Sequence, residues 1–215
     1  MFVCFTGIDG SGKTTLSKIV YNHYKKKYSK VRHTYGRFVP LLTFLIMKLG
    51  RTIFLKENNF VDYEKQLIEK KRLFRKHSFL AKFYISMVVF EYFFEILFKI
   101  IIPKKLGYSI IADRYVYDTV INDIAIDFDL TSDGVKSITN QFFAVIPKPD
   151  VTFVIDTPVE TAYNRKKDIP SQSYLKIRNE FYQKLVSDEI TKIDGTKEPA
   201  SLMDEVISRI EKLKD

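Results

Sequence analysis

The sequence predicts an α/β protein with a three-layer αβα fold, in which a parallel sheet lies between two layers of helices. Short runs rich in β-branched and aromatic residues alternate along the chain with longer segments of helical character. Repeated strand–helix–strand units favour parallel strands with helices on both faces of the sheet. A glycine-rich segment at residues 7–14 directly follows the first of these strands. Ligands are therefore expected beyond the carboxyl ends of the strands.

The expected elements follow one another closely. Strands are expected at Phe2–Thr6, Val31–Tyr35, Tyr108–Ala112, Val151–Ile155 and Ile190–Ile193. Helices are expected at Lys13–Lys27, Pro40–Leu49, Tyr63–Lys76, Phe79–Ile102, Asp118–Phe128, Ser132–Ala144, 158–166, Tyr174–Ser187 and Leu202–Lys214. Pro103 is expected to stop the longest helix, and Thr157 with Glu160 looks like a capping box. Because no repeat, low-complexity tract or linker interrupts this order, residues 1–215 are expected to form a single domain.

The segment Phe79–Ile102 is apolar enough to imitate a membrane span. It carries Lys82, Glu91, Glu95 and Lys99, and ionised groups within a span are costly. A long, mostly buried helix is therefore expected, with no membrane contact. Glu91, Glu95 and Lys99 are spaced four residues apart and form one polar stripe. Glu95 and Lys99 fit an exposed ion pair, whereas Glu91 is a candidate to face a ligand.

The composition and the charge distribution indicate the cellular compartment and the kinds of partner to expect. The one cysteine, Cys4, lies in an apolar run, so no internal disulfide is possible and a core position in a reducing cytoplasm is expected. No signal peptide is expected, because no basic start precedes a cleavable apolar segment. The net charge is +9, and residues 1–100 hold 19 Lys and Arg against 7 Asp and Glu. This basic half fits either an anionic partner or a solvated, lysine-rich surface.

Residues Gly7–Thr14 match the phosphate-loop pattern G-x-x-x-x-G-K-[ST], in the required position between a strand and a helix. Such a loop turns backbone N–H groups toward phosphate oxygens at a helix N-terminus. Lys13 is expected to reach the β- and γ-phosphates of ATP, and the Thr14 hydroxyl to bind Mg²⁺. The expected phosphate cradle comprises Gly7, Gly10, Ser11, Gly12, Lys13 and Thr14.

Asp9 lies inside this loop, where phosphate would repel its carboxylate. Its side chain is therefore expected to point away from the triphosphate, either toward a hydroxyl of a second substrate or into a local turn.

Three functional classes are compatible with the loop: a small-molecule or nucleotide kinase, a GTPase-like switch, and an ATPase acting on a macromolecule. Residues Thr191–Asp194 match a loose guanine-recognition pattern but lie in an expected strand, and Asp113-Arg114-Tyr115-Val116 is not the D-x-x-G of a switch protein. The pair Asp113-Arg114 fits a kinase. The carboxylate can hold Mg²⁺ or position an acceptor, and the guanidinium can bind a phosphate. The alternative for this pair is a surface ion pair.

The chain resembles the thymidylate kinase family over nearly its whole length. The resemblance rests on Phe5–Thr15, on Asp113-Arg114-Tyr115, on Pro149–Asp156 and on Asp194-Gly195-Thr196. It implies a five-stranded parallel sheet, ATP with Mg²⁺, and a small nucleotide as the second substrate rather than a nucleic acid. Asp9 would contact the acceptor sugar, Arg114 the acceptor phosphate, and Arg165 would belong to a lid at about 165–173. Further candidates are Thr15, Gly195 and Thr196 for ATP, and Asp113 and Tyr115 for the acceptor.

The departures from the family pattern concern the acceptor side. Tyr35–Pro40 replaces the usual R-E-P-G-G-like stretch, and the long helix reads Phe90–Glu95 with no arginine. Arg37 and Glu91 are the candidates on this side, although Arg37 also fits a surface position. Some relatives carry a catalytic arginine where this chain has Gly10, so a lid cation is expected to complete catalysis. Arg165 is the first candidate, and the alternatives are Lys166, Lys167 and Arg178.

The expected reaction is phosphorylation of dTMP to dTDP by ATP. A different small acceptor is the alternative, and a nucleotide-dependent switch or binding protein is the more remote one. Because relatives dimerise, a homodimer through the helix 79–102 is also expected.

Overall fold

The computed structural model describes residues 1–41, 43, 71, 78–185 and 187–213. The predicted helix Tyr63–Lys76 and most of the predicted helix Pro40–Leu49 lie outside the described residues.

The described residues form a five-stranded, all-parallel sheet, which confirms the predicted fold class. The strands are β1 (Phe2–Thr6), β2 (Val31–Tyr35), β3 (Ser109–Asp113), β4 (Val151–Asp156) and β5 (Ile190–Asp194). Their order across the sheet is β2-β3-β1-β4-β5. All five residues of β1 are buried, as expected for a central strand covered on both faces. The central position of β1 places the loop that follows it between the carboxyl ends of β3 and β4.

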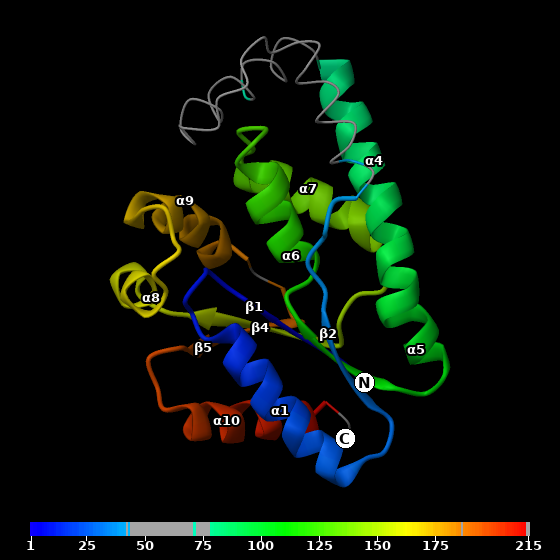
Figure 1. Ribbon diagram of the computed structural model, residues 1–215, viewed down its shortest axis with the longest axis vertical. Helices are drawn as coiled ribbons and strands as arrows, with labels where there is room; N and C mark the ends of the chain where they lie inside the picture. The colour runs from blue at the N-terminus through cyan, green and yellow to red at the C-terminus, as the bar shows by residue number, and fades with distance from the viewer. Residues whose placement is uncertain (42, 44–70, 72–77, 186, 214–215) are drawn as a thin grey trace.

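Helices cover both faces of this sheet (Figure 1). They are α1 (Lys13–Lys27), α4 (Ser78–Ile96), α5 (Ile102–Lys105), α6 (Val116–Thr119), α7 (Ser132–Phe143), α8 (Val159–Arg165), α9 (Gln172–Gln183) and α10 (Pro199–Glu211). Helices α1 and α10 lie on one face, and α4, α6 and α7 lie on the other. Alternate side chains of β1 enter two separate apolar clusters, Val3 and Phe5 toward α1 and α10, Phe2 and Cys4 toward α4 and α7.

The prediction that Pro103 stops the long helix is wrong. After α4 the chain makes a π-helical turn at Leu97–Ile101 and continues into α5, with Pro103 in the first turn of that helix. The π-helical turn before Pro103 changes the backbone hydrogen-bond pattern at the point where the chain meets the proline, so the helix continues past it. The helix ends instead at Gly107, which has a φ of 84°.

The expectation that the segment 79–102 is mostly buried is also wrong. Its side chains at Val88, Tyr92, Ile96 and Ile100 are buried, but five phenylalanines on the outer side are exposed. The reason is that α4 lies at the margin of its helical layer, so only one stripe reaches the core (Figure 1). Among the described residues, no helix is long and apolar enough to cross a membrane.

Candidate active site

The glycine-rich loop between β1 and α1 adopts backbone angles that only glycine takes readily. Gly7, Gly10 and Gly12 have φ angles of 143°, 82° and 99°. At Gly10 an added Cβ would lie 2.1 Å from the carbonyl oxygen of Ala162 in α8. The loop is therefore held by close backbone contact with the segment after β4, as well as by its own turn.

Thr157 also belongs to this loop contact. The sequence predicts that Thr157 caps the following helix, but Pro158 occupies the N-cap position of α8 and no side chain caps it. The buried Thr157 hydroxyl instead donates to the carbonyl oxygen of Ser11, at 3.2 Å. The capping-box prediction is wrong because this tertiary hydrogen bond takes the hydroxyl that the local pattern assigns to the helix.

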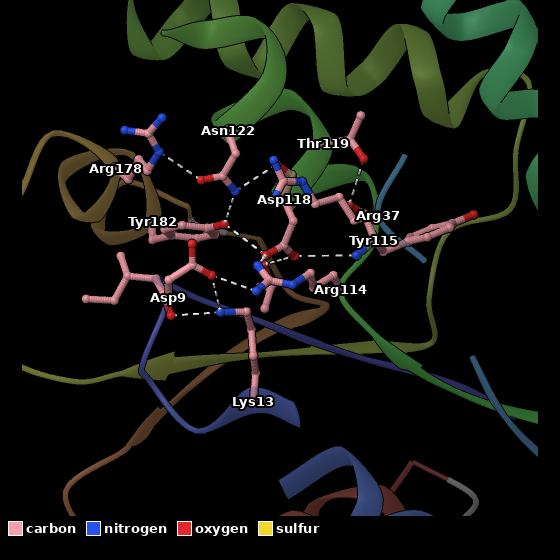
Figure 2. Close-up of polar contacts among 12 residues, drawn as sticks. Asp9, Lys13, Arg37, Arg114, Tyr115, Asp118, Thr119, Asn122, Arg178 and Tyr182 are labelled. Carbon is pink, nitrogen blue, oxygen red and sulfur yellow. Dashed lines mark hydrogen bonds and ion pairs between the residues drawn. The ribbon is translucent and has the colours of Figure 1, made fainter. Parts of the chain in front are cut away.

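Asp9 points toward the end of β3, as Figure 2 shows. Its carboxylate accepts a hydrogen bond from Arg114 Nη2 at 2.6 Å and lies 3.5 Å from Lys13 Nζ. Lys13 Nζ donates to the carbonyl oxygen of Ile8 at 2.8 Å, so the ammonium group lies inside the loop. The structure thus joins the phosphate-loop lysine, the internal acid and the arginine after β3 in one group.

The charges in this group shift one another's ionisation. Burial opposes the charged form of Asp9, but Lys13 and Arg114 outweigh it and hold the pKa of that carboxyl below its usual range. Burial, followed by the Arg114 charge, lowers the pKa of Lys13 to about 8, although Asp118, Asp9 and Asp113 oppose the change. The lysine that would meet the phosphates therefore loses its proton more readily in the ligand-free protein than an exposed lysine does.

Several buried polar atoms beside the loop lack a hydrogen-bond partner within the described part of the chain. They are Ser11 Oγ, Asp113 Oδ1 and Arg114 Nε. Unpartnered buried groups are uncommon, and at a strand edge they mark a place for a ligand, an ion or water. Arg114 also has a φ of 70°, an unusual value for a residue other than glycine. These observations fit an anion-binding edge with one metal-binding carboxylate.

Sequence reasoning missed Asp118, Asn122 and Tyr182 behind Arg114, and it named Arg178 only as a candidate lid cation. Asp118 is fully buried in α6, and its carboxylate accepts from Arg114 Nη1 at 3.3 Å and from the Tyr182 hydroxyl at 3.0 Å. Asn122 Nδ2 donates to the same Tyr182 oxygen at 3.1 Å, and Arg178 Nε donates to Asn122 Oδ1 at 3.0 Å. Arg114, Asp118 and Asn122 are four residues apart, and this spacing was the available signal.

The candidates on the acceptor side are engaged with other parts of the chain. One edge of the Arg37 guanidinium forms a two-point ion pair with Asp123. The Glu91 carboxylate accepts hydrogen bonds from the backbone N–H groups of Leu41 and Thr43. Glu91 therefore positions the segment after β2, and Arg37 is not an isolated surface residue.

Glu95 and Lys99 continue this arrangement. They form an ion pair, as the stripe on the helix predicts, but each also holds the chain after β2. Glu95 accepts from the N–H of Val39 at 3.2 Å, and Lys99 Nζ donates to the carbonyl oxygen of Tyr35 at 3.1 Å. The stripe on α4 thus fixes the segment that carries Arg37.

The remaining candidate site residues lie in two parts of the structure, the core and the contact between α8 and the loop after β5. Tyr115 is buried in the core, where its hydroxyl donates to the carbonyl oxygen of Pro147 at 2.9 Å. Arg165, at the end of α8, donates from Nη1 to the carbonyl oxygen of Gly195 at 3.0 Å. The Thr196 hydroxyl bonds to Asp194 at 2.7 Å. Arg165 therefore connects the base of the expected lid with the loop after β5.

The pattern Thr191–Asp194, which loosely matches a guanine-recognition motif, lies within β5. Lys192 Nζ donates to the backbone carbonyl oxygen of Gln183 at 2.6 Å. The residues that the motif would present to a base are thus part of the sheet, which disfavours a switch protein.

Comparison with known proteins agrees with this geometry. The thymidylate kinase of Fervidobacterium nodosum is 30% identical over 189 residues, which cover 86% of this chain and 81% of that protein. The chain belongs to the thymidylate kinase family. The thymidylate kinase of Thermosipho africanus is 29% identical over 225 aligned positions, 99% of this chain and 98% of that protein. The thymidylate kinase of a Wolbachia strain from Culex pipiens is 28% identical over 86% of this chain. No family model matches the sequence.

Membership of the thymidylate kinase family agrees with the all-parallel sheet and with a P-loop between β1 and α1. At 26–30% identity the chain is a divergent member. The position of Arg114 at the end of β3 places it beside the loop, as the family resemblance implies.

The loop geometry predicts a difference between two alanine substitutions at positive φ. Gly10→Ala should lower the free energy of unfolding by about 3 kcal/mol or more, because backbone strain adds to the collision with Ala162. Gly12→Ala should cost only about 1–2 kcal/mol, because its Cβ meets nothing within 4 Å. Urea-induced unfolding followed by circular dichroism measures both. Equal losses would contradict the contact with α8.

The lowered pKa of Lys13 predicts proton uptake on nucleotide binding. Bound phosphates favour the ammonium form, so the pKa should rise above about 8 in the complex. The affinity for ATP should then be highest below that pH and fall by up to about tenfold per pH unit above it. Titration calorimetry in EDTA, at pH 8.5 in buffers of different ionisation enthalpy, measures the uptake. Lys13→Met should abolish it, and uptake that persists in this variant would contradict the assignment.

Proposed function

We propose that this protein transfers the γ-phosphoryl group of ATP to dTMP, giving ADP and dTDP. The observation that carries the proposal is the ion pair between Asp9 of the phosphate loop and Arg114 after β3. It connects a site for the donor triphosphate with an arginine suited to an acceptor phosphate, so two phosphate-bearing substrates would meet at one edge of the sheet. The related thymidylate kinases support dTMP as the acceptor.

In this reaction an oxygen of the acceptor phosphate attacks the γ-phosphorus. The bond from that phosphorus to the β–γ bridging oxygen breaks, and ADP leaves with the electron pair. Such a transfer depends mainly on positioning and on neutralising charge. Lys13 would neutralise the β- and γ-phosphates, and Arg114 would hold the acceptor phosphate. Arg165 would add a cation from the lid, and Asp9 would orient the acceptor.

Mg²⁺ would be held by the Thr14 hydroxyl and the Asp113 carboxylate together with the nucleotide. The buried, unpartnered Asp113 Oδ1 fits this role. Among the described residues, no group of three or more His, Cys, Asp or Glu side chains gathers to hold a metal. That donor set fits Mg²⁺, which protein sites commonly bind through one or two carboxylates plus substrate phosphates. The ion would neutralise charge that develops on the transferring phosphates.

A different small phosphorylated acceptor is the second candidate. It is favoured by the contacts of Arg37 and Glu91, which lie in the two segments where the sequence departs from the family pattern. Arg37 is paired with Asp123, and Glu91 holds backbone N–H groups. A contact between an acceptor and the paired edge of Arg37 would therefore require the ion pair with Asp123 to break. The contacts with the acceptor would then have to offset the free energy of that ion pair.

Release of ADP from Mg-ATP, measured across dTMP, dUMP, UMP, CMP, AMP and GMP, tests the function. We expect turnover with dTMP above that with the other acceptors. Lys13→Ala should lower kcat/KM by at least about 10²-fold, because a charge aimed at the transferring phosphate is lost. Lys18→Ala, an exposed lysine later in α1, is the matched control and should leave turnover unchanged. Turnover with another acceptor alone would select the second candidate, and none with any acceptor would reject both.

A homodimer is proposed through the outer face of α4. The exposed large apolar side chains along α4 and the π-helical turn after it are Phe79, Phe83, Phe90, Phe94 and Phe98, beside the exposed polar Lys82 and Ser86. Large contiguous apolar surface is unusual on a monomer, and one repeated side chain along a helix is self-complementary, as a twofold interface requires. A second copy of the chain is therefore the partner that this face fits.

Analytical ultracentrifugation tests the dimer. The wild-type protein should sediment at twice the chain mass of 25.2 kDa. Phe90→Ser combined with Phe94→Ser should shift it to the monomer, because the centre of the apolar stripe is lost. The double variant Lys25→Ser with Lys26→Ser, on the exposed end of α1, is the control. A wild-type monomer would refute this assembly.

A further inference from the structure

The Asp118 carboxylate is the point where the acceptor side and the helix after the lid meet. It is fully buried, and both of its oxygens accept hydrogen bonds. Oδ2 accepts from the Thr6 hydroxyl of β1 at 2.6 Å and from the N–H of Tyr115 at 3.4 Å. Oδ1 accepts from Arg114 at 3.3 Å and from Tyr182 at 3.0 Å. The first pair of contacts fixes the carboxylate to the sheet, so the second pair is presented from a fixed position (Figure 2).

Tyr182 brings α9 to this carboxylate. Its ring is buried, and burial together with the Asp118 charge raises its pKa, so its hydroxyl stays protonated and donates. The hydroxyl oxygen also accepts from Asn122 Nδ2. Arg178, one turn earlier on α9, donates to Asn122 and lies with its guanidinium 3.4 Å from the centre of the Tyr174 ring. Helix α9 is therefore attached to the α6 segment through several directional contacts.

Arg114 lies between two carboxylates at unequal distances. Asp9 is at 2.6 Å and Asp118 is at 3.3 Å. Without Asp118, only Asp9 would hold the guanidinium, and it would draw the cation toward the phosphate loop. Without the Tyr182 hydroxyl, the Asp118 oxygen would bond to Arg114 alone and draw the cation toward α6. The relative strength of these two ion pairs therefore sets the position of the Arg114 guanidinium.

We propose that Asp118 and Tyr182 are positioning residues that set the orientation of Arg114 for the acceptor phosphate. The proposal rests on the proposed function, in which Arg114 binds that phosphate. Asp118 opposes the pull of Asp9, and Tyr182 moderates Asp118 from α9. Because α9 begins at Gln172, at the end of the expected lid, a helix connected to the ATP side thereby helps to position the acceptor phosphate.

Steady-state kinetics of Asp118→Asn and Tyr182→Phe test the proposal, with acceptor and ATP varied separately. Asp118→Asn keeps the shape and removes the charge, and should raise the acceptor KM by at least about tenfold. Tyr182→Phe should raise it by about three- to tenfold. The KM for ATP should stay within about twofold of the wild-type value in Tyr182→Phe, because Tyr182 contacts neither the phosphate loop nor Lys13. In Asp118→Asn it should rise less than the acceptor KM, because the Asp118 charge acts on Lys13 only at a distance. The acceptor used is dTMP, or the acceptor that the wild-type enzyme prefers in the panel.

Tyr117→Phe is the matched control. Tyr117 lies in α6 beside Asp118, and its ring packs on Phe143 outside the contacts of Arg114. This variant loses a tyrosine hydroxyl from the same region and should keep both KM values. The double variant of Asp118→Asn with Tyr182→Phe should be no worse than Asp118→Asn alone, because both act through one carboxylate. Thermal unfolding establishes that each variant is folded, and if Asp118→Asn does not fold, Tyr182→Phe decides.

A selective rise of the acceptor KM supports the proposal. A fall in kcat with both KM values unchanged, equal rises of both KM values, or a Tyr117→Phe variant that behaves like Tyr182→Phe would overturn it. Those failures differ from failure of the proposed function. In the latter case the wild-type enzyme itself turns over no acceptor, and the positioning role falls with it.

Discussion

The ion pair between Asp9 and Arg114 joins the two halves of the site, and the neighbouring charges are arranged around it. Lys13, Asp9, Arg114 and Asp118 alternate in sign along one line of contacts. Their side chains are at most 14% exposed. Buried charges carry a large desolvation cost, so each must meet an opposite charge or a donor. The four charges cancel in the ligand-free protein, so an incoming phosphate meets cations that are already paired with carboxylates.

The sheet order makes this line of charges possible. Because β1 lies between β3 and β4, the loop after β1 meets Arg114 on one side and the segment Thr157–Ala162 on the other. The Thr157 hydroxyl and the close approach of Ala162 to Gly10 fix the loop from the β4 side. The loop backbone is thus held by packing, while its charges are held by ion pairs from the β3 side. Such a division lets the phosphate cradle keep its shape while Arg114 adds a phosphate to its partners.

Features that depend on adjacent residues were predictable from the sequence, whereas contacts between residues far apart in the chain were not. The five strands and the phosphate loop follow from local alternation and from one motif, because their signals lie within a few adjacent residues. Thr157 was misassigned because the local capping pattern and a tertiary hydrogen bond compete for one hydroxyl. Tyr182 was missed because its partner Asp118 lies 64 residues away. The exposure of α4 was misjudged, since a helix that is apolar outside one polar stripe does not reveal which of its apolar sides meets the core.

The two arginines of the acceptor side differ in how their N–H donors are occupied. Asp123 takes one edge of the Arg37 guanidinium, and burial together with that pairing leaves Arg37 little gain from a further anion unless Asp123 is displaced. Arg114 has only one donor on each carboxylate, and its buried Nε has no partner among the described residues. A guanidinium carries five N–H donors, so Arg114 keeps donors for a phosphate without giving up either carboxylate. We therefore expect the acceptor phosphate to bind Arg114 in preference to Arg37. Arg37 would contact another part of the acceptor.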